Sequence, residues 1–363
     1  MSSKVIAFPQ LGDYQFPIKK LLKNLTHLPV LDIPPITKKT IQLGSKNSPD
    51  SVCVPFKYNL GNFIEALEMG ANVLFQAGGG CRYRYYAEVQ ETILRDLGYD
   101  FSMIQIIEKD HLRFRELYQH FTKLNPNLKR RTFYHQILMA FVYIYYLDKI
   151  DDIIRARIGF EVTPNSFLKL KKRFIARMDN CNGIISMSRT YRKFKKRFLK
   201  LKIDKPKNCL KVGVIGELYT AMEPFATYEL EKMLASYHIE IKRFTNLTYL
   251  LIKKALFTPF MKHKVKKYCQ YTLGADGLDN VYRVLWLSKH KYDGIIHTKP
   301  TGCTPEIGAL PIIMKAAKEN NMPIIFLSFD EQTAVEGLTT RIEAFYDLIQ
   351  IKKEKQNDRI LRN

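Results

Sequence analysis

Residues 72–97 are NVLFQAGGGCRYRYYAEVQETILRDL: a short apolar run, a run of glycines and a helix-like segment, in that order. The run at 72–76 is mostly apolar, which is typical of a strand buried on both faces of a parallel sheet. The glycines before Cys81 allow a tight turn and a close approach of the backbone to a ligand. The segment 86–97 has helical spacing and a glycine stop, and its predicted inward residues are Val89, Ile93 and Leu97. This strand–turn–helix order predicts a unit of a doubly wound α/β sheet.

The same alternation recurs before and after a middle segment of different character. Further strands are predicted at 4–8, 29–33, 101–107, 210–215, 239–244, 293–297 and 323–328. Further helices are predicted at 17–25, 56–69, 225–237, 247–271, 279–290, 305–320 and 340–352. We therefore expect three parts: an α/β lobe over 1–107, a basic helical segment over 108–207 and a second α/β lobe over 208–363.

The composition is that of a globular protein with a large core. The chain has 363 residues, of which 46% are hydrophobic, and six cysteines are too few for a disulfide framework in a chain of this length. The first residues predict a strand and not a signal peptide, and no window is apolar enough for a membrane span. We expect a cytoplasmic protein in a reducing compartment, where thiols stay available as metal ligands.

The formal charge is +23, and much of the excess lies in one segment. From Lys169 to Lys207 there are fifteen Lys and Arg residues against Asp179 and Asp204. Such a surface attracts nucleic acid, an acidic protein or an anionic ligand such as a nucleotide or coenzyme A, or it is a solvated helical face. Because no RNP-like, zinc-finger or basic-zipper pattern accompanies it, we do not expect a nucleic-acid-binding function.

Three cysteines stand beside tight-turn residues where strands should pass into helices. Cys53 precedes Pro55 by two residues, Cys81 follows three glycines, and Cys303 lies between Gly302 and Pro305. Thiolates at such turns are candidate ligands, and three of them can hold an iron–sulfur cluster while one iron keeps no protein ligand. The alternatives are buried small side chains, the interpretation we prefer for Cys181, Cys209 and Cys269, or a zinc site completed by His297.

A resemblance to a known family adds to this interpretation. The segments concerned are CVPFKYNLGNFIEAL at 53–67, QAGGGCRY at 76–83, GELY at 216–219, EPF at 223–225, GCTPEI at 302–307, LSFDEQT at 327–333 and TRIEAF at 340–345. Together they resemble the activase-related branch of the 2-hydroxyacyl-CoA dehydratase and benzoyl-CoA reductase superfamily. The middle basic segment matches least.

The resemblance implies a fold, a cofactor and partners. It implies two flavodoxin-like lobes and a [4Fe-4S] cluster held by Cys53, Cys81 and Cys303, with Gly79 and Gly80 beside it. It also implies low-potential electrons from a separate ATP-hydrolysing iron–sulfur activase, oxygen-free chemistry on a small molecule or an acyl-CoA, and a homodimer or heterodimer. The chain itself has no Walker-type phosphate loop, so ATP hydrolysis would come from the partner.

Two glutamates are candidate proton-handling or catalytic residues. Glu306 follows Cys303 at the start of a predicted helix, and Glu217 follows a predicted strand. Helix-start charge and turn chemistry explain both equally well. The runs GADG at 274–277 and HTKPT at 297–301 depart from the family pattern, which leaves the substrate open. A second hypothesis is a non-catalytic scaffold or regulatory module whose cysteines are structural, with zinc or without metal.

Overall fold

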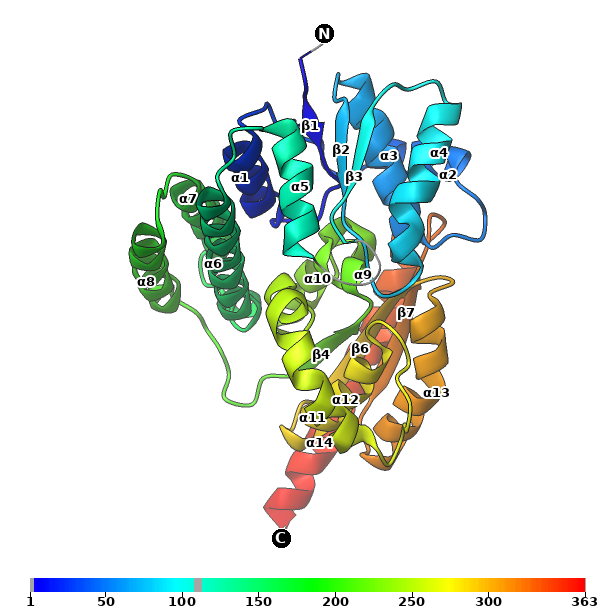
Figure 1. Cartoon of the computed structure of the whole chain (residues 1–363). Helices are drawn as coiled ribbons and strands as arrows, with labels where there is room; N and C mark the ends of the chain where they lie inside the picture. The colour runs from blue at the N-terminus through cyan, green and yellow to red at the C-terminus, as the bar shows by residue number, and fades with distance from the viewer. Residues whose placement is uncertain (1–2, 108–112, 363) are drawn as a thin grey trace. The chain divides into compact units, whose positions relative to one another are not determined.

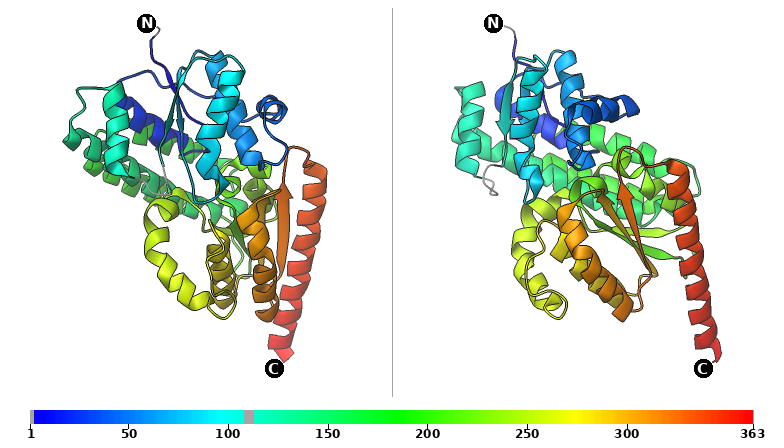
Figure 2. Two further views of the ribbon diagram at one scale, coloured as in Figure 1. Left: turned by 45° about the vertical axis from the view of Figure 1, so that its right-hand side comes forward. Right: turned by 90° about the vertical axis from the view of Figure 1, so that its right-hand side faces the viewer.

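The computed structural model describes residues 3–107 and 113–362, and it contains two parallel sheets with helices around them (Figure 1, Figure 2). The chain divides into two compact units. The first comprises Met1–Ile144 and Cys181–Ile184, and the second comprises Tyr145–Asn180 and Ile185–Asn363. The predicted fold class, mixed α/β with two doubly wound sheets, is confirmed.

The first unit has a three-stranded parallel sheet in the order β1-β2-β3. Its strands are β1 (Ile6–Ala7), β2 (Val73–Gln76) and β3 (Ser102–Gln105). Its helices are α1 (Gln15–Thr26), α2 (Lys38–Asn47), α3 (Val54–Glu68), η1 (Arg82–Tyr85), α4 (Tyr86–Asp96), α5 (Phe114–Leu124) and the first part of α6 (Arg130–Arg155).

The second unit has a four-stranded parallel sheet in the order β5-β4-β6-β7. Its strands are β4 (Lys211–Gly216), β5 (Glu240–Arg243), β6 (Gly294–Pro300) and β7 (Ile324–Phe329). Before the sheet come η2 (Ile158–Phe160), α7 (Ser166–Asp179) and α8 (Ile184–Lys200). With the sheet come α9 (Leu218–Met222), η3 (Pro224–Thr227), α10 (Leu230–Ser236), η4 (Tyr249–Lys253), α11 (Lys254–Val265), α12 (Gly277–Lys289), α13 (Thr304–Glu319) and α14 (Val335–Arg362).

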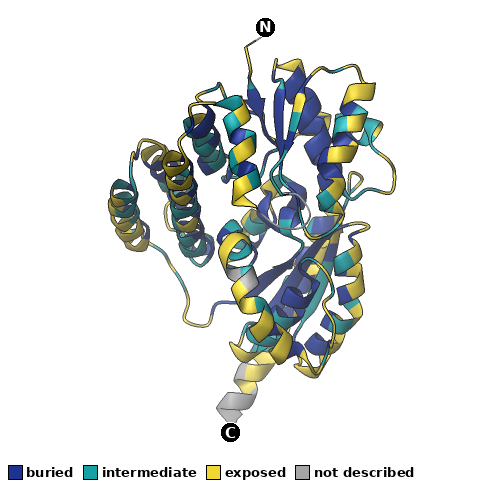
Figure 3. Ribbon diagram, in the orientation of Figure 1, coloured by how far each residue is buried: buried dark blue, intermediate teal, exposed yellow. Residues whose placement is uncertain are grey.

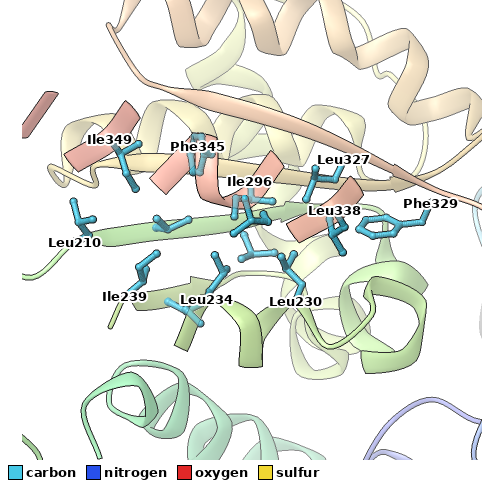
Figure 4. Packing of buried hydrophobic residues seen from close by; sticks show 14 residues of the cluster. Leu210, Leu230, Leu234, Ile239, Ile296, Leu327, Phe329, Leu338, Phe345 and Ile349 are labelled. Carbon is cyan, nitrogen blue, oxygen red and sulfur yellow. The ribbon is translucent and has the colours of Figure 1, made fainter. Parts of the chain in front are cut away.

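Helices cover both faces of each sheet. In the first unit, β2 directs Leu74 toward α3 and α4, and it directs Val73 and Phe75 toward α1, α5 and α6. In the second unit, α10 and α14 pack on one face, where Leu230, Phe345 and neighbouring apolar side chains form a core (Figure 4). α11, α12 and α13 pack on the other face. Both units are therefore three-layer sandwiches, as expected for apolar parallel strands.

The two units share one strand topology. Numbered along the chain, the strands of the second sheet lie in the order 2-1-3-4. In the first unit, Val30 forms a single parallel bridge to Ile6, on the side of β1 away from β2. If this bridge is counted as the second strand, the first unit has the same order. This order is that of flavodoxin-like sheets, in which ligands bind at the carboxyl ends of the strands, where the order reverses.

Several details differ from the sequence predictions, among them the helix predicted at 247–271, which consists of η4 and α11 and ends at Val265. The predicted strand at 29–33 is reduced to the Val30 bridge, because proline lacks the N–H group that a longer ladder needs. The predicted helix at 225–237 is interrupted where Tyr228 and Glu229 take left-handed backbone conformations. The helix at 86–97 forms as α4, but Val89 and Leu97 are exposed, and its buried residues are Tyr86, Ala87, Gln90 and Leu94.

The middle segment contains α5 to α8, so the described residues 114–200 are largely helical, as predicted. The first residues of that predicted segment, 108–112, lie outside the described residues. The helix α2 at Lys38–Asn47 was not predicted. It begins with a reciprocal capping box between Thr37 and Thr40.

Candidate functional site

Cys81 lies directly after the strand β2 and the glycine run. It is the N-terminal cap of η1, and its Sγ accepts a hydrogen bond from the Tyr83 backbone N–H at 3.4 Å. A Cβ added at Gly79 would meet the Tyr83 ring at 2.8 Å, so this glycine lets the ring approach closely. A Cβ added at Gly80 would meet no atom within 4 Å, so the space beside Gly80 is open within the described structure.

Cys53 also caps a helix in the first unit. It precedes α3, and Pro55 occupies the first turn of that helix, where a missing N–H group costs nothing. The Cys53 Sγ lies 2.8 Å from the hydroxyl of Tyr86 on α4. The rings of Tyr83 and Tyr86 pack edge to face with centroids 4.5 Å apart. Cys53 and Cys81 therefore both contact this tyrosine pair.

Cys303 has the corresponding position in the second unit. It follows β6, the third strand of its sheet, just as Cys81 follows β2. Gly302 takes a left-handed conformation with φ 77°, which turns the chain so that Cys303 becomes the N-terminal cap of α13. Cys303 is buried, and Pro305 again stands in the first turn of the helix. Each of the three predicted cysteine ligands is thus the N-cap residue of a helix.

Lys299 on β6 is the nearest buried cation in the sequence to Cys303. Its side chain is only 7% exposed. Burial lowers the pKa of Lys299, and the negative charges of the Cys303 thiolate and Glu306 oppose this shift without reversing it. Lys299 therefore keeps a positive charge less readily than an exposed lysine does.

Glu306 is fully buried three residues after Cys303. Its two carboxylate oxygens accept hydrogen bonds from the Asn280 side-chain amide at 3.0 and 2.9 Å. One of them also accepts a hydrogen bond from His297 Nε2 at 2.6 Å. The His297 Nδ1 atom is buried and has no hydrogen-bond partner among the described residues.

The buried polar network extends along α12. The Asn280 Oδ1 atom accepts hydrogen bonds from the Gly216 N–H at 3.2 Å and from Arg283 Nη1 at 3.0 Å. Arg283 Nη1 also donates to Thr245 Oγ1 at 2.6 Å. The network therefore joins the ends of β4 and β6 to the first turn of α13. Sequence reasoning did not find Asn280 and Arg283.

Lys254 forms a second polar cluster at the start of α12. Its Nζ lies 2.7 Å from Asp276 Oδ1 and 3.1 Å from Asp279 Oδ2. Burial opposes the charge on Lys254, but the two carboxylates outweigh that effect and raise its pKa above the ordinary value. Asp276 also accepts a hydrogen bond from the Leu218 N–H at 3.2 Å. The run at 274–277, which departs from the family pattern, therefore anchors α9 and α11.

Glu217 follows β4, the first strand of the second sheet, and caps α9. Its carboxylate accepts hydrogen bonds from the Tyr219 and Thr220 N–H groups at 3.0 and 2.9 Å, and from Thr220 Oγ1 at 2.8 Å. Burial nevertheless raises the pKa of Glu217 to about 7, since it outweighs these hydrogen bonds, and Asp276 adds to the increase. Glu217 can therefore accept or release a proton near neutral pH.

This pKa predicts that protein stability depends on pH through Glu217. In the folded protein the Glu217 carboxyl holds its proton up to about pH 7, whereas in the unfolded chain its pKa has the ordinary value of 4.5. The free energy of unfolding should therefore fall as the pH rises from 4.5 to about 7. The free energy of unfolding should fall by on the order of 3 kcal/mol over this pH range, and Glu217→Gln should remove this pH dependence. Urea unfolding across this range, followed by the fluorescence of Trp286, tests the difference. The same pH dependence in wild type, Glu217→Gln and the exposed-site control Glu336→Gln would contradict the prediction.

The predicted ligands lie in both units. Cys53 and Cys81 belong to the first and Cys303 to the second. Over residues 3–107 and 113–362, no group of three or more His, Cys, Asp or Glu side chains is arranged to hold a metal ion. Of the helices described, none combines the length and the apolar character needed to cross a lipid bilayer.

Comparison with known proteins identifies a related family. Residues 264–349 match the family model for the D-component of 2-hydroxyglutaryl-CoA dehydratase. The matched segment contains α12, β6, Cys303, Glu306 and β7, and it does not reach Cys53 or Cys81. A comparison with curated proteins gave no significant match. The family match confirms the predicted resemblance at the level of the 2-hydroxyacyl-CoA dehydratase superfamily, and the activase-related branch stays a prediction.

Proposed function

We propose, from the relationship of residues 264–349 to the 2-hydroxyacyl-CoA dehydratase superfamily, that this chain is a dehydratase-type component that holds a [4Fe-4S] cluster. Its ligands would be Cys53, Cys81 and Cys303. It would receive low-potential electrons from an ATP-hydrolysing iron–sulfur activase in the cytoplasm. It would then reduce a small molecule or an acyl-CoA, or pass the electron on, as a homodimer or heterodimer.

The observation that best supports this proposal is the shared place of two cysteines in a repeated topology. Cys81 and Cys303 each follow the third strand of a 2-1-3-4 sheet, next to the point where the strand order reverses. That point is where flavodoxin-like sheets bind ligands. The shared turn position supports a common role as ligands for Cys81 and Cys303.

The donor set fits an iron–sulfur cluster. Cys53, Cys81 and Cys303 all cap helix starts, where unpaired N–H groups and the helix dipole favour the thiolate. The open space beside Gly80 leaves room for a bulky group next to Cys81. Three thiolates also match a cluster that leaves one iron for a different ligand.

The bound cluster would supply one-electron chemistry at low potential. The surrounding side chains would hold the ligands and move protons. Glu217 is suited to proton transfer because its pKa is about 7. Glu306 is suited to positioning, because its hydrogen bonds with Asn280 and His297 fix the first turn of the helix that Cys303 caps.

Metal analysis of protein purified without oxygen tests the proposal. We expect a brown protein with about four iron and four acid-labile sulfide per chain. Zinc in place of iron, or no metal after anaerobic purification and reconstitution, would overturn the proposal and favour the scaffold or regulatory module. Purification in air provides a control, since an exposed cluster should then lose iron.

A further inference from the structure

The helices α7 and α8 carry a large part of the positive charge of the chain, and their phenylalanines are buried. Phe167 and Phe174 on α7 pack with Phe198 and Phe194 on α8, with ring centroids 6.3 and 5.6 Å apart. Because these rings are buried, they are not available for stacking on nucleic-acid bases. The polar sides of the helices decide what this surface can bind.

One stripe of α8 is exposed along its whole length. Its members are Ile185, Arg189, Arg192, Lys196 and Leu199. They are spaced four, three, four and three residues apart, so they share one side of the helix. Ile185 is 69% exposed and Leu199 is 49% exposed. We call these five residues the α8 stripe.

The α8 stripe lies on the side opposite to the buried face of the helix. That buried face consists of Met187, Phe194 and Phe198. The sequence of α8 contains no acidic residue, and further exposed cations flank the stripe: Lys193, Lys195, Arg197 and Lys200. Over the described residues, no ion pair joins Arg189, Arg192 or Lys196 to a carboxylate. Figure 3 shows much of α8 as exposed.

We propose that the α8 stripe is a docking surface for an acidic helix of a partner protein. The partner helix would place carboxylates against Arg189, Arg192 and Lys196, and apolar side chains against Ile185 and Leu199. Protein interfaces combine apolar contacts with arginine, and opposite charges select the partner and speed its association. The two apolar ends lie about 21 Å apart along the helix, a length that a single facing helix can cover.

The α8 stripe fits a DNA duplex or a membrane surface less well than an acidic helix. A DNA duplex would neutralise the three cations, but it would leave Ile185 and Leu199 against phosphates. A membrane-bound helix needs a continuous apolar face, whereas here the centre of the stripe is cationic. An acidic helix with apolar ends is complementary to all five residues.

Fluorescence anisotropy with a designed peptide tests the proposal. The probe is a helical peptide of about 20 residues with three glutamates between two leucines, in the same spacing as the stripe. We expect the peptide to bind the whole protein. The triple change Arg189→Glu, Arg192→Glu and Lys196→Glu should weaken binding at least about tenfold, and Ile185→Ser with Leu199→Ser severalfold.

Matched controls decide between specific docking and general attraction. Lys262→Glu, Lys264→Glu and Lys266→Glu change the charge by the same amount at other exposed positions and should leave binding unchanged. A scrambled peptide should bind much more weakly. Equal weakening by the two triple variants, or equal binding of both peptides, would overturn the proposal.

Two further probes test the other occupants. Tighter binding of a short DNA duplex, with the steep salt dependence of phosphate contacts, would overturn the proposal in favour of nucleic acid. Tighter binding of phosphatidylserine vesicles would overturn it in favour of a membrane surface. Circular dichroism of each variant should confirm that these substitutions at exposed positions leave the helices intact.

The docking proposal does not depend on the cluster, because peptide binding can be measured on metal-free protein.

Discussion

Anaerobically purified Cys303→Ala protein should retain almost no iron, and Cys53→Ala and Cys81→Ala should behave in the same way. Each change removes one of three proposed thiolate ligands, and no fourth cysteine is predicted to replace it. A cluster bound by two thiolates is exposed to solvent and exchange, so it should be lost during purification. Iron and acid-labile sulfide per chain measure the loss directly.

The other three cysteines provide matched controls. Cys181, Cys209 and Cys269 are buried, and none of them follows the third strand of a sheet. Their alanine variants should retain the iron content of the wild type. Full iron retention in two of the three ligand variants would contradict the assignment, and so would iron loss in all six variants, which would indicate general instability.

Replacing Glu306 by alanine should lower the free energy of unfolding of the second unit by about 3–5 kcal/mol. Glu306 is fully buried, and its loss would leave the Asn280 amide and His297 Nε2 without their hydrogen-bond acceptor. A cavity would remain beneath the first turn of α13. Glu306→Gln keeps the volume and part of the hydrogen bonding, so it should cost less.

Urea unfolding of the metal-free protein measures this effect. Trp286 is the only tryptophan in the sequence and lies on α12, the helix that contains Asn280, so its fluorescence reports on the unit that contains Glu306. The control is Glu336→Ala, which removes an exposed acid from the first turn of α14 and should cost well under 1 kcal/mol. Similar costs for the two alanine variants would show that the buried hydrogen bonds contribute little.

The strands and most helices could be predicted because their apolar pattern is strong. All seven strands were predicted to within a few residues, since apolar runs bounded by glycine and proline are a clear signal for parallel sheets. The single failure, at 29–33, followed from prolines that limit the hydrogen-bonding ladder. The split of the helix at 225–237 depends on the left-handed conformations of Tyr228 and Glu229, and neither residue type signals such a conformation.

The candidate site could be predicted only in part. Turn residues and a resemblance led to the prediction of Cys53, Cys81, Cys303, Glu217 and Glu306 as site residues. The partners of Glu306 were missed because they come from α12, and contacts between distant segments leave no local pattern. One signal was present: Asp276, the N-cap of α12, and Asp279, Asn280 and Arg283 in its first two turns are spaced as a polar stripe in a largely apolar segment. A polar stripe beside buried strands indicates a buried network.

The parallel pairing of the strands also sets the order in which the chain can fold during its synthesis. In the first unit, β2 pairs with β1 and β3, so that sheet can close once residue 105 has left the ribosome. In the second unit, β4 can pair first with β5, but its other edge must wait for β6, because Val212 pairs with Gly294. One edge of the apolar strand β4 therefore stays unpaired until β6 has been made. During this interval the nascent chain should be most prone to aggregation and most dependent on chaperones.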